Sequence, residues 1–284
     1  MSVSGQQFVH GNKTVHISYS PRQHKTERLL QLQKKNGVLD LSKLYVVGIG
    51  PGAYEDMTLK AVHTLENCDV IVGYTVYVDL VKEHFPKKEF LTTPMRKEVE
   101  RCRMAFEQAA TGKNTAMICS GDAGVYGMSG LILEIGAEYP EVTVEIIPGV
   151  TAALSGAAVL GAPLMHDFAV ISLSDLMTPW EKIERRLQAA AESDMAICLY
   201  NPSSKKRADY LKKACDIMLE SKNPNTVCGI VSQIGREGEQ MQIYTLAALR
   251  EVQVDMFTTV FIGNETTKVV NGKMVTPRGY HINR

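Results

Sequence analysis

The chain has 284 residues, and its 31 Lys and Arg residues balance 31 Asp and Glu residues. At about 100 to 200 residues per domain, this length predicts two modest domains or one large one. With 45% hydrophobic and 22% charged residues, the composition excludes a largely disordered chain. A general nucleic-acid binder usually carries a basic surplus, because neutralised phosphates supply most of its affinity, so we expect no nucleic-acid partner.

Hydrophobic segments are too short for a membrane protein. The apolar runs fall well short of the roughly 18 to 20 residues that span a bilayer, and residues 1–24 lack the apolar core of a secretion signal. The cysteines form no CxxC pair, and Cys119, Cys198 and Cys228 lie in apolar runs, where a reduced thiol behaves as a small hydrophobic group. We therefore expect a cytoplasmic protein without membrane contact, disulfide framework or bound metal.

Residues 1–43 differ in composition from the rest of the chain. They are rich in Gln, Lys, His and Ser, and predict a polar N-terminal extension that is partly disordered. From residue 44 onward, short apolar runs alternate with amphipathic patterns. Strands are predicted at residues 44–49, 70–72, 115–119 and 142–147, and helices at residues 58–67, 96–111 and 125–139. This alternation is typical of a mainly parallel sheet flanked by helices.

The alternation of strand and helix starts again after Pro163. Strands are predicted at residues 169–173, 195–200, 226–232 and 258–263, and helices at residues 179–192 and 205–221. Gly and Pro interrupt the pattern at residues 161–167, which predicts a domain boundary there. We expect an α/β fold with two α/β domains, an N-terminal one at residues 44–162 and a C-terminal one at residues 163–284, both with mainly parallel sheets.

A glycine-rich turn follows the first predicted strand. Gly48, Gly50 and Gly52 permit positive φ angles and a close approach of backbone amides to a ligand. The spacing fits a dinucleotide-binding fingerprint, but the second predicted strand ends in Gly73-Tyr74, where a ribose-binding acid is expected. A nicotinamide oxidoreductase is therefore disfavoured, and this turn alone is also explained by tight-turn chemistry without a ligand.

Two further turns follow predicted strands. Ser120-Gly121-Asp122 comes after residues 115–119, and residues 148–151 come after the strand that ends at residue 147. Ligands of open α/β sheets bind outside the carboxyl ends of the strands. An Asp in such a place also serves as a helix N-cap, so Asp122 alone indicates no ligand. Three turns of this kind at three strand ends nevertheless favour a ligand site.

These turns, in this order, resemble the signature loops of the class III tetrapyrrole methyltransferases, which use S-adenosylmethionine. The resemblance covers residues 44–280 and is carried by Val47-Gly48-Ile49-Gly50-Pro51-Gly52, by Ser120-Gly121-Asp122 with Val125-Tyr126, and by Ile147-Pro148-Gly149-Val150-Thr151. Four more segments are similar to the ring-contracting members of the family, which act in cobalamin synthesis. These segments are residues 172–180, 199–207, 235–239 and 274–280.

The resemblance implies a two-domain α/β enzyme of the tetrapyrrole methylase fold, with the methyl donor in a cleft between the domains. It also implies a homodimer whose substrate is a small-molecule tetrapyrrole, methylated at C17 with contraction of the macrocycle. Ring contraction adds proton transfers to the methyl transfer. The sequence leaves open whether the substrate carries cobalt or is metal-free.

The resemblance also implies, position by position, which residues hold S-adenosylmethionine. They are Gly50, Pro51, Ser120, Gly121, Asp122, Val125, Thr151 and Ala152 in the N-terminal half, and Tyr200 and Asn201 in the C-terminal half. Tyr200 departs from the family pattern, in which several relatives carry methionine. A sulfonium donor with an amino-acid tail and a ribose needs backbone groups and an acid but no phosphate cradle. Pro51 fits this need, because it removes one N–H from the first turn.

Basic residues are expected to meet the carboxylates of a tetrapyrrole, because a guanidinium pairs with a carboxylate through two hydrogen bonds. We select Lys205, Arg236 and Arg278 as candidate substrate-binding residues. Lys205, together with Lys206 and Arg207, is equally well explained as the solvated start of a helix. Arg236 and Arg278 lie in glycine-containing turns, where a binding role is favoured.

Three residues are candidates for the proton transfers, namely Asp122, His166 and Asp175. Methyl transfer itself needs positioning of the two reactants rather than an enzyme nucleophile. The ordinary pKa of a histidine suits proton transfer near neutrality, although a lone His beside Asp167 is often a hydrogen-bonded structural residue. Asp175 lies in a serine-rich turn, where local capping is the competing explanation.

Alternatives from other classes stay open at this point. Another C-methyltransferase of the same family would carry the same donor loops. A non-catalytic protein that binds tetrapyrroles and S-adenosylmethionine would carry them as well. A methyltransferase of ribosomal RNA is disfavoured by the neutral charge and by the lack of a stripe of aromatic and basic residues.

Overall fold

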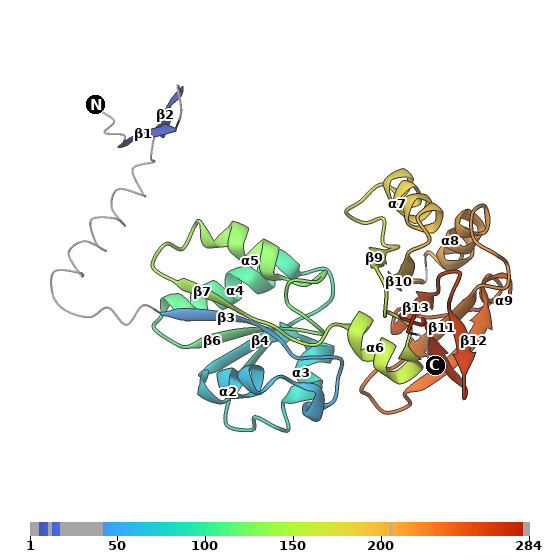
Figure 1. Ribbon diagram of the computed structural model, residues 1–284. Helices are drawn as coiled ribbons and strands as arrows, with labels where there is room; N and C mark the ends of the chain where they lie inside the picture. Colours follow the sequence, from blue (N-terminus) through green and yellow to red (C-terminus); the bar gives the residue numbers. More distant parts are fainter. Residues whose placement is uncertain (1–5, 11–12, 18–41, 205, 281–284) are drawn as a thin grey trace. The chain divides into compact units, whose positions relative to one another are not determined.

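The computed structural model describes residues 6–10, 13–17, 42–204 and 206–280 of the chain (Figure 1). The chain divides into two compact units. The first unit consists of the residues up to Val47 together with Val62–Cys119 and Tyr126–Ile147. The second unit takes Gly48–Ala61, Ser120–Val125 and the residues from Pro148 onward. All three glycine-bearing turns therefore belong to the second unit, and the domain boundary near residue 163 stays a prediction.

The first unit is built on a five-stranded sheet of order β5-β4-β6-β3-β7. Its strands are β3 (Lys43–Gly48), β4 (Val70–Tyr74), β5 (Glu89–Thr93), β6 (Thr115–Cys119) and β7 (Thr143–Ile147). The pairs β3–β7, β4–β5 and β4–β6 are parallel. Every residue of β6 is buried, which explains its continuous apolar sequence, because a central parallel strand is covered on both faces.

Helices cover both faces of this sheet, with α2 and α3 on one face and α4 and α5 on the other (Figure 1). They are α2 (Leu59–Asn67), α3 (Thr75–Val81), α4 (Glu98–Ala110) and α5 (Ser129–Gly136), and a short 3-10 helix, η1 (Tyr54–Asp56), precedes α2. The buried residues of α4 include Cys102, Phe106 and Ala109, which lie three and four apart and form one face. Phe106 also stacks on Tyr139, at a ring separation of 4.6 Å.

The second unit contains a five-stranded sheet of order β12-β11-β13-β10-β9. Its strands are β9 (Phe168–Ser172), β10 (Ala196–Tyr200), β11 (Val227–Ser232), β12 (Gln240–Thr245) and β13 (Thr258–Ile262). Only the neighbours β9 and β10 are paired in parallel, whereas β13 is antiparallel to both of its neighbours, β10 and β11. The sheet is therefore mixed, and β11 and β12 at its edge form an antiparallel hairpin.

The helices of the second unit are α6 (Ala152–Leu160), α7 (Trp180–Glu192), α8 (Tyr210–Leu219) and α9 (Leu246–Leu249). A small sheet of β14 (Lys268–Val270), β15 (Lys273–Val275) and β8 (Gly161–Ala162) completes it. Helix α6 lies close to the large sheet, because a Cβ at Gly156 would come within 2.9 Å of the ring of Phe261. The small residues of this helix therefore permit its close packing on β13.

The structure confirms an α/β fold with two five-stranded sheets. The expectation of a mainly parallel sheet is wrong for the second unit, in which three of the four strand pairs are antiparallel. Several predicted elements differ as well. The helix predicted at residues 125–139 begins only at Ser129, because Tyr126 has a φ of 53°, outside the helical region. The helix predicted at residues 205–221 begins only at Tyr210, so Arg207 lies in the preceding loop. Among the elements that were not predicted are α3, β5, β12 and α9.

Most of the polar N-terminal extension lies outside the described residues. Within it, β1 (Gln6–His10) and β2 (Lys13–Ile17) pair in antiparallel register. Across the described chain, no helix is long and apolar enough to cross a membrane. All six cysteines are free and buried, and burial raises the pKa of the Cys68, Cys102 and Cys215 thiols to about 12.

Candidate donor site

The first two glycine turns are hydrogen-bonded to each other. The amide of Gly50 donates to the carbonyl of Gly121 at 3.1 Å, and the amide of Gly121 donates back to Gly50 at 2.7 Å. Both glycines have positive φ angles, 73° and 67°, which an L side chain rarely adopts. Because these two amides are already paired with each other's carbonyls, they are not available to a phosphate.

The third turn approaches the other two so closely that no side chain fits. A Cβ at Gly149 would come within 2.2 Å of the carbonyl oxygen of Gly121. A Cβ at Gly48 would come within 2.7 Å of the same oxygen and of the Gly149 amide nitrogen. These contacts between backbones explain why glycine stands at both positions.

The carboxylate of Asp122 connects the second turn with the third. Its Oδ1 accepts a hydrogen bond from the amide of Gly124 at 2.7 Å, and its Oδ2 accepts one from the amide of Gly149 at 2.9 Å. A carboxylate has about four lone-pair positions, so these two bonds leave acceptor capacity for a ligand. Asp122 is therefore placed as an organiser of the turns that also offers negative charge.

A side chain from β10 forms hydrogen bonds with the first turn of α6. The Tyr200 hydroxyl lies 2.6 Å from Thr151 Oγ1 and accepts a hydrogen bond from the Ala153 amide at 2.7 Å. Thr151 is the N-cap residue of α6, where backbone amides have no partner within the helix. The tyrosine that departs from the family pattern is thus used to hold the start of the helix.

Asn201 follows Tyr200 and joins the ends of two neighbouring strands. Its backbone has a φ of 53°, and its Nδ2 donates to Ser172 Oγ at 2.9 Å. Ser172 Oγ also accepts from the amide of Ser174 at 3.2 Å. Ser172, the last residue of β9, was not predicted as a site residue, although it begins the segment 172–180 that resembles the ring-contracting members.

Arg236 reaches the first two turns from the loop between β11 and β12. Its Nε donates to the carbonyl of Pro51 at 3.3 Å, and its Nη2 donates to Ser120 Oγ at 3.5 Å. These contacts all lie within the second unit. The structure thus brings together most of the predicted donor residues with Arg236, while Val125 and Ala152 lie half-buried in the same turns.

Asp175 is held by two partners that were not predicted. Its carboxylate accepts hydrogen bonds from the Tyr210 hydroxyl at 2.7 Å and from Nε of Arg207. The hydrogen bond from Tyr210, followed by the bond and the positive charge of Arg207, holds the pKa of Asp175 below its usual value. Asp175 is therefore an ionised carboxylate at neutral pH.

His166 and Arg278 both join residues 165–166 to the segment after β15. The Nε2 of His166 lies 2.8 Å from the carbonyl oxygen of Pro277 and must donate to it, and Nη1 of Arg278 donates to the carbonyl of Met165 at 3.0 Å. Because Nε2 carries the proton, the neutral ring keeps Nδ1 as its acceptor. The third substrate-binding candidate, Lys205, lies outside the described residues.

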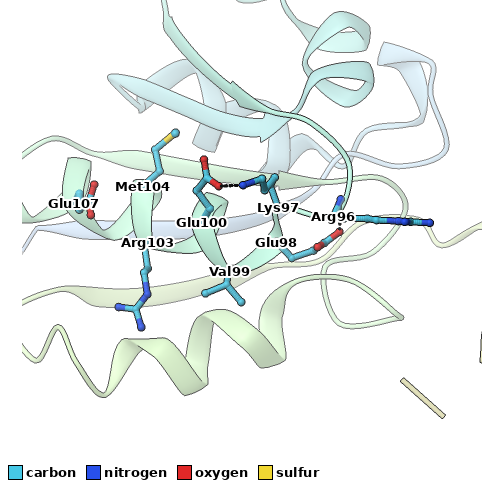
Figure 2. A pocket seen from close by; sticks show the side chains of 8 residues that line it. All are labelled: Arg96, Lys97, Glu98, Val99, Glu100, Arg103, Met104 and Glu107. Carbon is cyan, nitrogen blue, oxygen red and sulfur yellow. Dashed lines mark hydrogen bonds and ion pairs between the residues drawn. The ribbon is translucent and has the colours of Figure 1, made fainter. Parts of the chain in front are cut away.

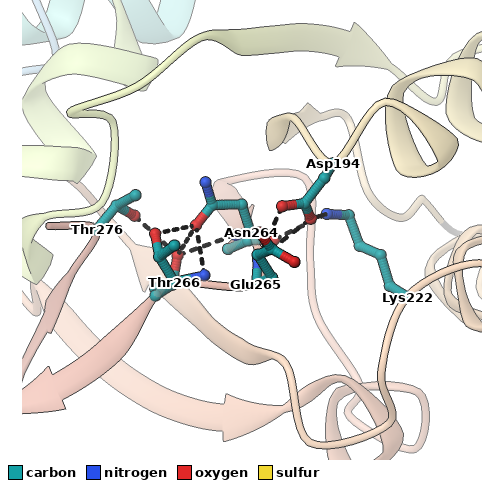
Figure 3. Close-up of polar contacts among 8 residues, drawn as sticks. Asp194, Lys222, Asn264, Glu265, Thr266 and Thr276 are labelled. Carbon is teal, nitrogen blue, oxygen red and sulfur yellow. Dashed lines mark hydrogen bonds and ion pairs between the residues drawn. The ribbon is translucent and has the colours of Figure 1, made fainter. Parts of the chain in front are cut away.

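A network of buried polar side chains holds the same C-terminal segment (Figure 3). Thr276 Oγ1 donates to the carbonyl of Pro163 at 2.7 Å and lies 2.8 Å from Thr267 Oγ1. Farther along, the buried Lys222 donates to Asp194 Oδ1 at 3.0 Å and to the carbonyl of Gly263 at 3.2 Å. These bonds hold the C-terminal segment in place within the second unit.

A separate surface pocket lies at the start of α4 in the first unit (Figure 2). Its charged lining consists of Arg96, Lys97, Arg103, Glu98, Glu100 and Glu107. Lys97 pairs with Glu100 at 2.8 Å, and Arg103 pairs with Glu138 at 2.6 Å. Positive and negative charges are equal in number, so the lining favours neither an anion nor a cation. Within the described part of the chain, no three metal-binding side chains gather.

Comparison with known proteins supports one family. Residues 43–250 match the Tetrapyrrole (Corrin/Porphyrin) Methylases. The chain is 48% identical over 238 residues to a probable cobalt-factor III C(17)-methyltransferase of Salmonella typhimurium, with 84% of this chain and 99% of the relative covered. It is 38% identical over 247 residues to a precorrin-3B C(17)-methyltransferase of Sinorhizobium sp, with 84% and 96% covered.

A solved structure supports the same conclusion. The crystal structure of the methyltransferase CobJ aligns with a TM-score of 0.76 at 33% sequence identity, covering 83% of this chain and 100% of that one. The α/β architecture, the three interlocked turns and the sequence matches therefore agree. The chain belongs to the tetrapyrrole methylase family.

Proposed function

We propose that this chain transfers a methyl group from S-adenosylmethionine to C17 of a tetrapyrrole in cobalamin biosynthesis, with contraction of the macrocycle. The observation that carries the proposal is the 48% identity, over nearly the whole relative, to a protein named for C17-methylation. The three turns that the resemblance assigns to the donor lie together in one unit, which supports the same function.

The cobalt-containing substrate, cobalt-factor III, is favoured over precorrin-3B. Four relatives named for cobalt-factor III are 42% to 48% identical to this chain, whereas the precorrin-3B relative is 38% identical. The cobalt would belong to the substrate, since the described residues hold no cluster of metal-binding side chains.

The groups at the three turns fit a methyl donor of this kind. Asp122 offers acceptor oxygens for an ammonium or a ribose hydroxyl, Ser120 and Thr151 offer hydroxyls, and the paired glycine amides offer no phosphate site. The proposed donor-binding set is Gly50, Pro51, Ser120, Gly121, Asp122, Val125, Thr151, Ala152, Tyr200 and Asn201. When bound, S-adenosylmethionine supplies an electrophilic methyl group.

The chain's own contribution to methyl transfer is positioning. Turns that are locked by mutual hydrogen bonds present their polar groups in one arrangement before the ligands arrive, which avoids an ordering cost on binding. Alignment of two reactants in this way can supply about 7 to 11 kcal/mol of the barrier. Lys205 and Arg278 are proposed to hold carboxylates of the tetrapyrrole.

Of the three candidates for proton transfer, His166 is the one whose contacts suit the task. Asp175 is held as an ionised carboxylate by Tyr210 and Arg207, and both oxygens of Asp122 accept hydrogen bonds from backbone amides. His166 uses only Nε2 for its bond to Pro277, so Nδ1 can take up and release a proton. We assign the proton transfers of ring contraction to His166. A homodimer and a cytoplasmic location stay predictions.

The test is anaerobic incubation of the full-length chain with methyl-labelled S-adenosylmethionine and each trimethylated substrate, cobalt-bound and metal-free. Mass spectrometry and carbon-13 spectra then locate the new methyl group. One methyl on C17 of a contracted ring supports the proposal. A methyl on another carbon would indicate a different C-methyltransferase of the family, and donor binding without turnover would indicate a non-catalytic binding protein.

A further inference from the structure

Arg236 lies where the loop between β11 and β12 packs against the two N-terminal turns. Its Nε donates to the carbonyl of Pro51 and its Nη2 to the hydroxyl of Ser120. One guanidinium therefore bonds to residues that lie far apart in the sequence, and both of them belong to the proposed donor-binding set. The sequence alone favoured a different role for this side chain, the binding of substrate carboxylates.

The guanidinium is placed by its own loop. The Arg236 amide donates to the carbonyl of Gln233 at 2.9 Å, and the Gly235 amide donates to Glu239 Oε2 at 2.8 Å. The carbon at the centre of the guanidinium lies 5.5 Å from the centroid of the Phe257 ring, within the range of a cation–π contact. A preformed loop and an aromatic face thus restrict where Arg236 can point.

Close packing at two glycines fixes the same arrangement. A Cβ at Gly52 would come within 2.5 Å of Cγ of Arg236 and within 2.8 Å of the carbonyl oxygen of Gly235. At Gly235, whose φ is 64°, a Cβ would come within 3.1 Å of Cγ of Pro51. The side chain of Arg236 therefore passes directly over the first turn, and Gly52 leaves the space that it needs.

We infer that Arg236 is a positioning residue for the donor site, which holds the Pro51 carbonyl and the Ser120 hydroxyl in fixed relative positions. A charged group donates stronger hydrogen bonds than a neutral one, and the planar guanidinium can donate to two acceptors in a fixed geometry. The inference rests on the proposed function, because that function assigns these turns to S-adenosylmethionine.

The experiment uses S-adenosylhomocysteine as the probe, titrated calorimetrically into the full-length chain without any tetrapyrrole. We expect Arg236→Met to weaken binding by about tenfold, the effect of losing one to two hydrogen bonds. Arg236→Lys should restore part of the affinity, because an ammonium reaches one of the two acceptors. Arg250→Met is the matched control, since Arg250 pairs with Asp216 and Glu251 at the surface and should leave binding unchanged.

Kinetics separate this role from substrate binding. If Arg236 positions the donor site, Arg236→Met should raise the KM for S-adenosylmethionine and change the KM for the tetrapyrrole by no more than about twofold. The reverse pattern, with unchanged affinity for S-adenosylhomocysteine, would overturn the inference and return Arg236 to the substrate. If Arg236→Met fails to fold, Phe257→Leu decides, because it removes only the aromatic face and should weaken the same binding.

Binding by the wild-type chain distinguishes a failure of the proposed function from a failure of this inference. If the wild-type chain does not bind S-adenosylhomocysteine, the proposed function falls and the inference falls with it. If the wild-type chain binds and Arg236→Met binds equally well, the inference alone is overturned.

Discussion

The hydroxyl of Tyr200 lies within hydrogen-bond distance of both Thr151 Oγ1 and the amide of Ala153, so one phenol from β10 completes the start of α6. Thr151 is proposed to bind the donor, and its hydroxyl is oriented by this contact. The stability of α6 and the affinity for the donor should therefore change together when the phenol is altered.

The first prediction concerns Tyr200→Phe, which keeps the ring and removes the hydroxyl. Loss of the bond to the Ala153 amide should destabilise the chain by about 1 to 2 kcal/mol. This change is expected to lower the Tm by several degrees and to weaken binding of S-adenosylhomocysteine. Tyr244→Phe is the control, because the hydroxyl of the half-buried Tyr244 donates to Gln242, two residues away on the same strand. An unchanged Tm in Tyr200→Phe would contradict the prediction.

The second prediction concerns Asp122→Asn. Asn has the same shape but offers one acceptor oxygen in place of two, so either Gly124 or Gly149 would face an NH₂ group instead of an acceptor. We expect the affinity for S-adenosylhomocysteine to fall about tenfold or more. Calorimetric titration measures it, with Asp209→Asn at the exposed start of α8 as control. Equal affinities in both variants would exclude an organising role for Asp122.

The third prediction concerns His166→Gln. The amide nitrogen of Gln can still donate to the Pro277 carbonyl, so the structural bond is kept while the titratable ring is lost. If His166 transfers protons, ring contraction should slow by about 10² to 10⁴-fold. Donor affinity should stay the same. A variant with the wild-type rate would assign a purely structural role to this histidine.

The fourth prediction concerns the pH dependence of stability at Asp175. Its pKa is lowered in the folded chain, so its stabilising contribution is complete above the unfolded value of about 3.9 and is lost as pH falls through the lower folded value. The difference in Tm between the wild type and Asp175→Asn should be constant from neutral pH to about pH 5 and shrink below pH 4.

A second variant identifies the cause of this lowered pKa. Tyr210→Phe removes the hydrogen bond that lowers it most and keeps the pairing with Arg207. The acid sensitivity of this variant should lie between those of the wild type and Asp175→Asn. A difference in Tm that does not depend on pH in either variant would show that Asp175 has the same pKa in the folded and unfolded chain.

The fifth prediction concerns the buried side chain of Lys222, which is only 2% exposed. Lys222→Met leaves the carbonyl of Gly263 without this donor and Asp194 without its cation. Because Asp194 is 40% exposed, the cost should lie below that of a fully buried pair, at about 2 to 3 kcal/mol. Thermal unfolding measures it. Lys212→Met, whose partner Glu251 is exposed, should cost less than about 0.5 kcal/mol.

The sequence predicted central elements better than edge elements. Residues 115–119 were predicted as a strand with the bounds that β6 has, because a buried central strand is an unbroken apolar run between turn residues. Strand β12 was missed, since it lies at the edge of its sheet and has polar residues among its apolar ones. The late start of α5 was hidden too, because nothing in the pattern showed that Tyr126 has a positive φ.

At the candidate site, the turns were predictable and their partners were not. Glycines at the ends of three predicted strands indicated a ligand site from the sequence alone. The sequence did not show that Arg236 reaches Pro51, because the two residues are 185 positions apart and the contact depends on the whole fold. The same holds for Tyr200, which hydrogen-bonds to the start of α6. It also holds for Arg207, which was predicted inside a helix but lies in the loop before α8 and pairs with Asp175.

Two of the three segments of the first unit end at the last residue of a strand, Cys119 of β6 and Ile147 of β7. The third segment ends at Val47, one residue before the end of β3. The second unit is correspondingly assembled from three separate stretches of chain. No single cut in the polypeptide can therefore release either unit with all of its parts. A gene split at the predicted boundary near residue 163 would yield two fragments, which would have to associate before the candidate donor site could form. An uninterrupted chain brings the three turns to Tyr200 and Arg236 without such an association.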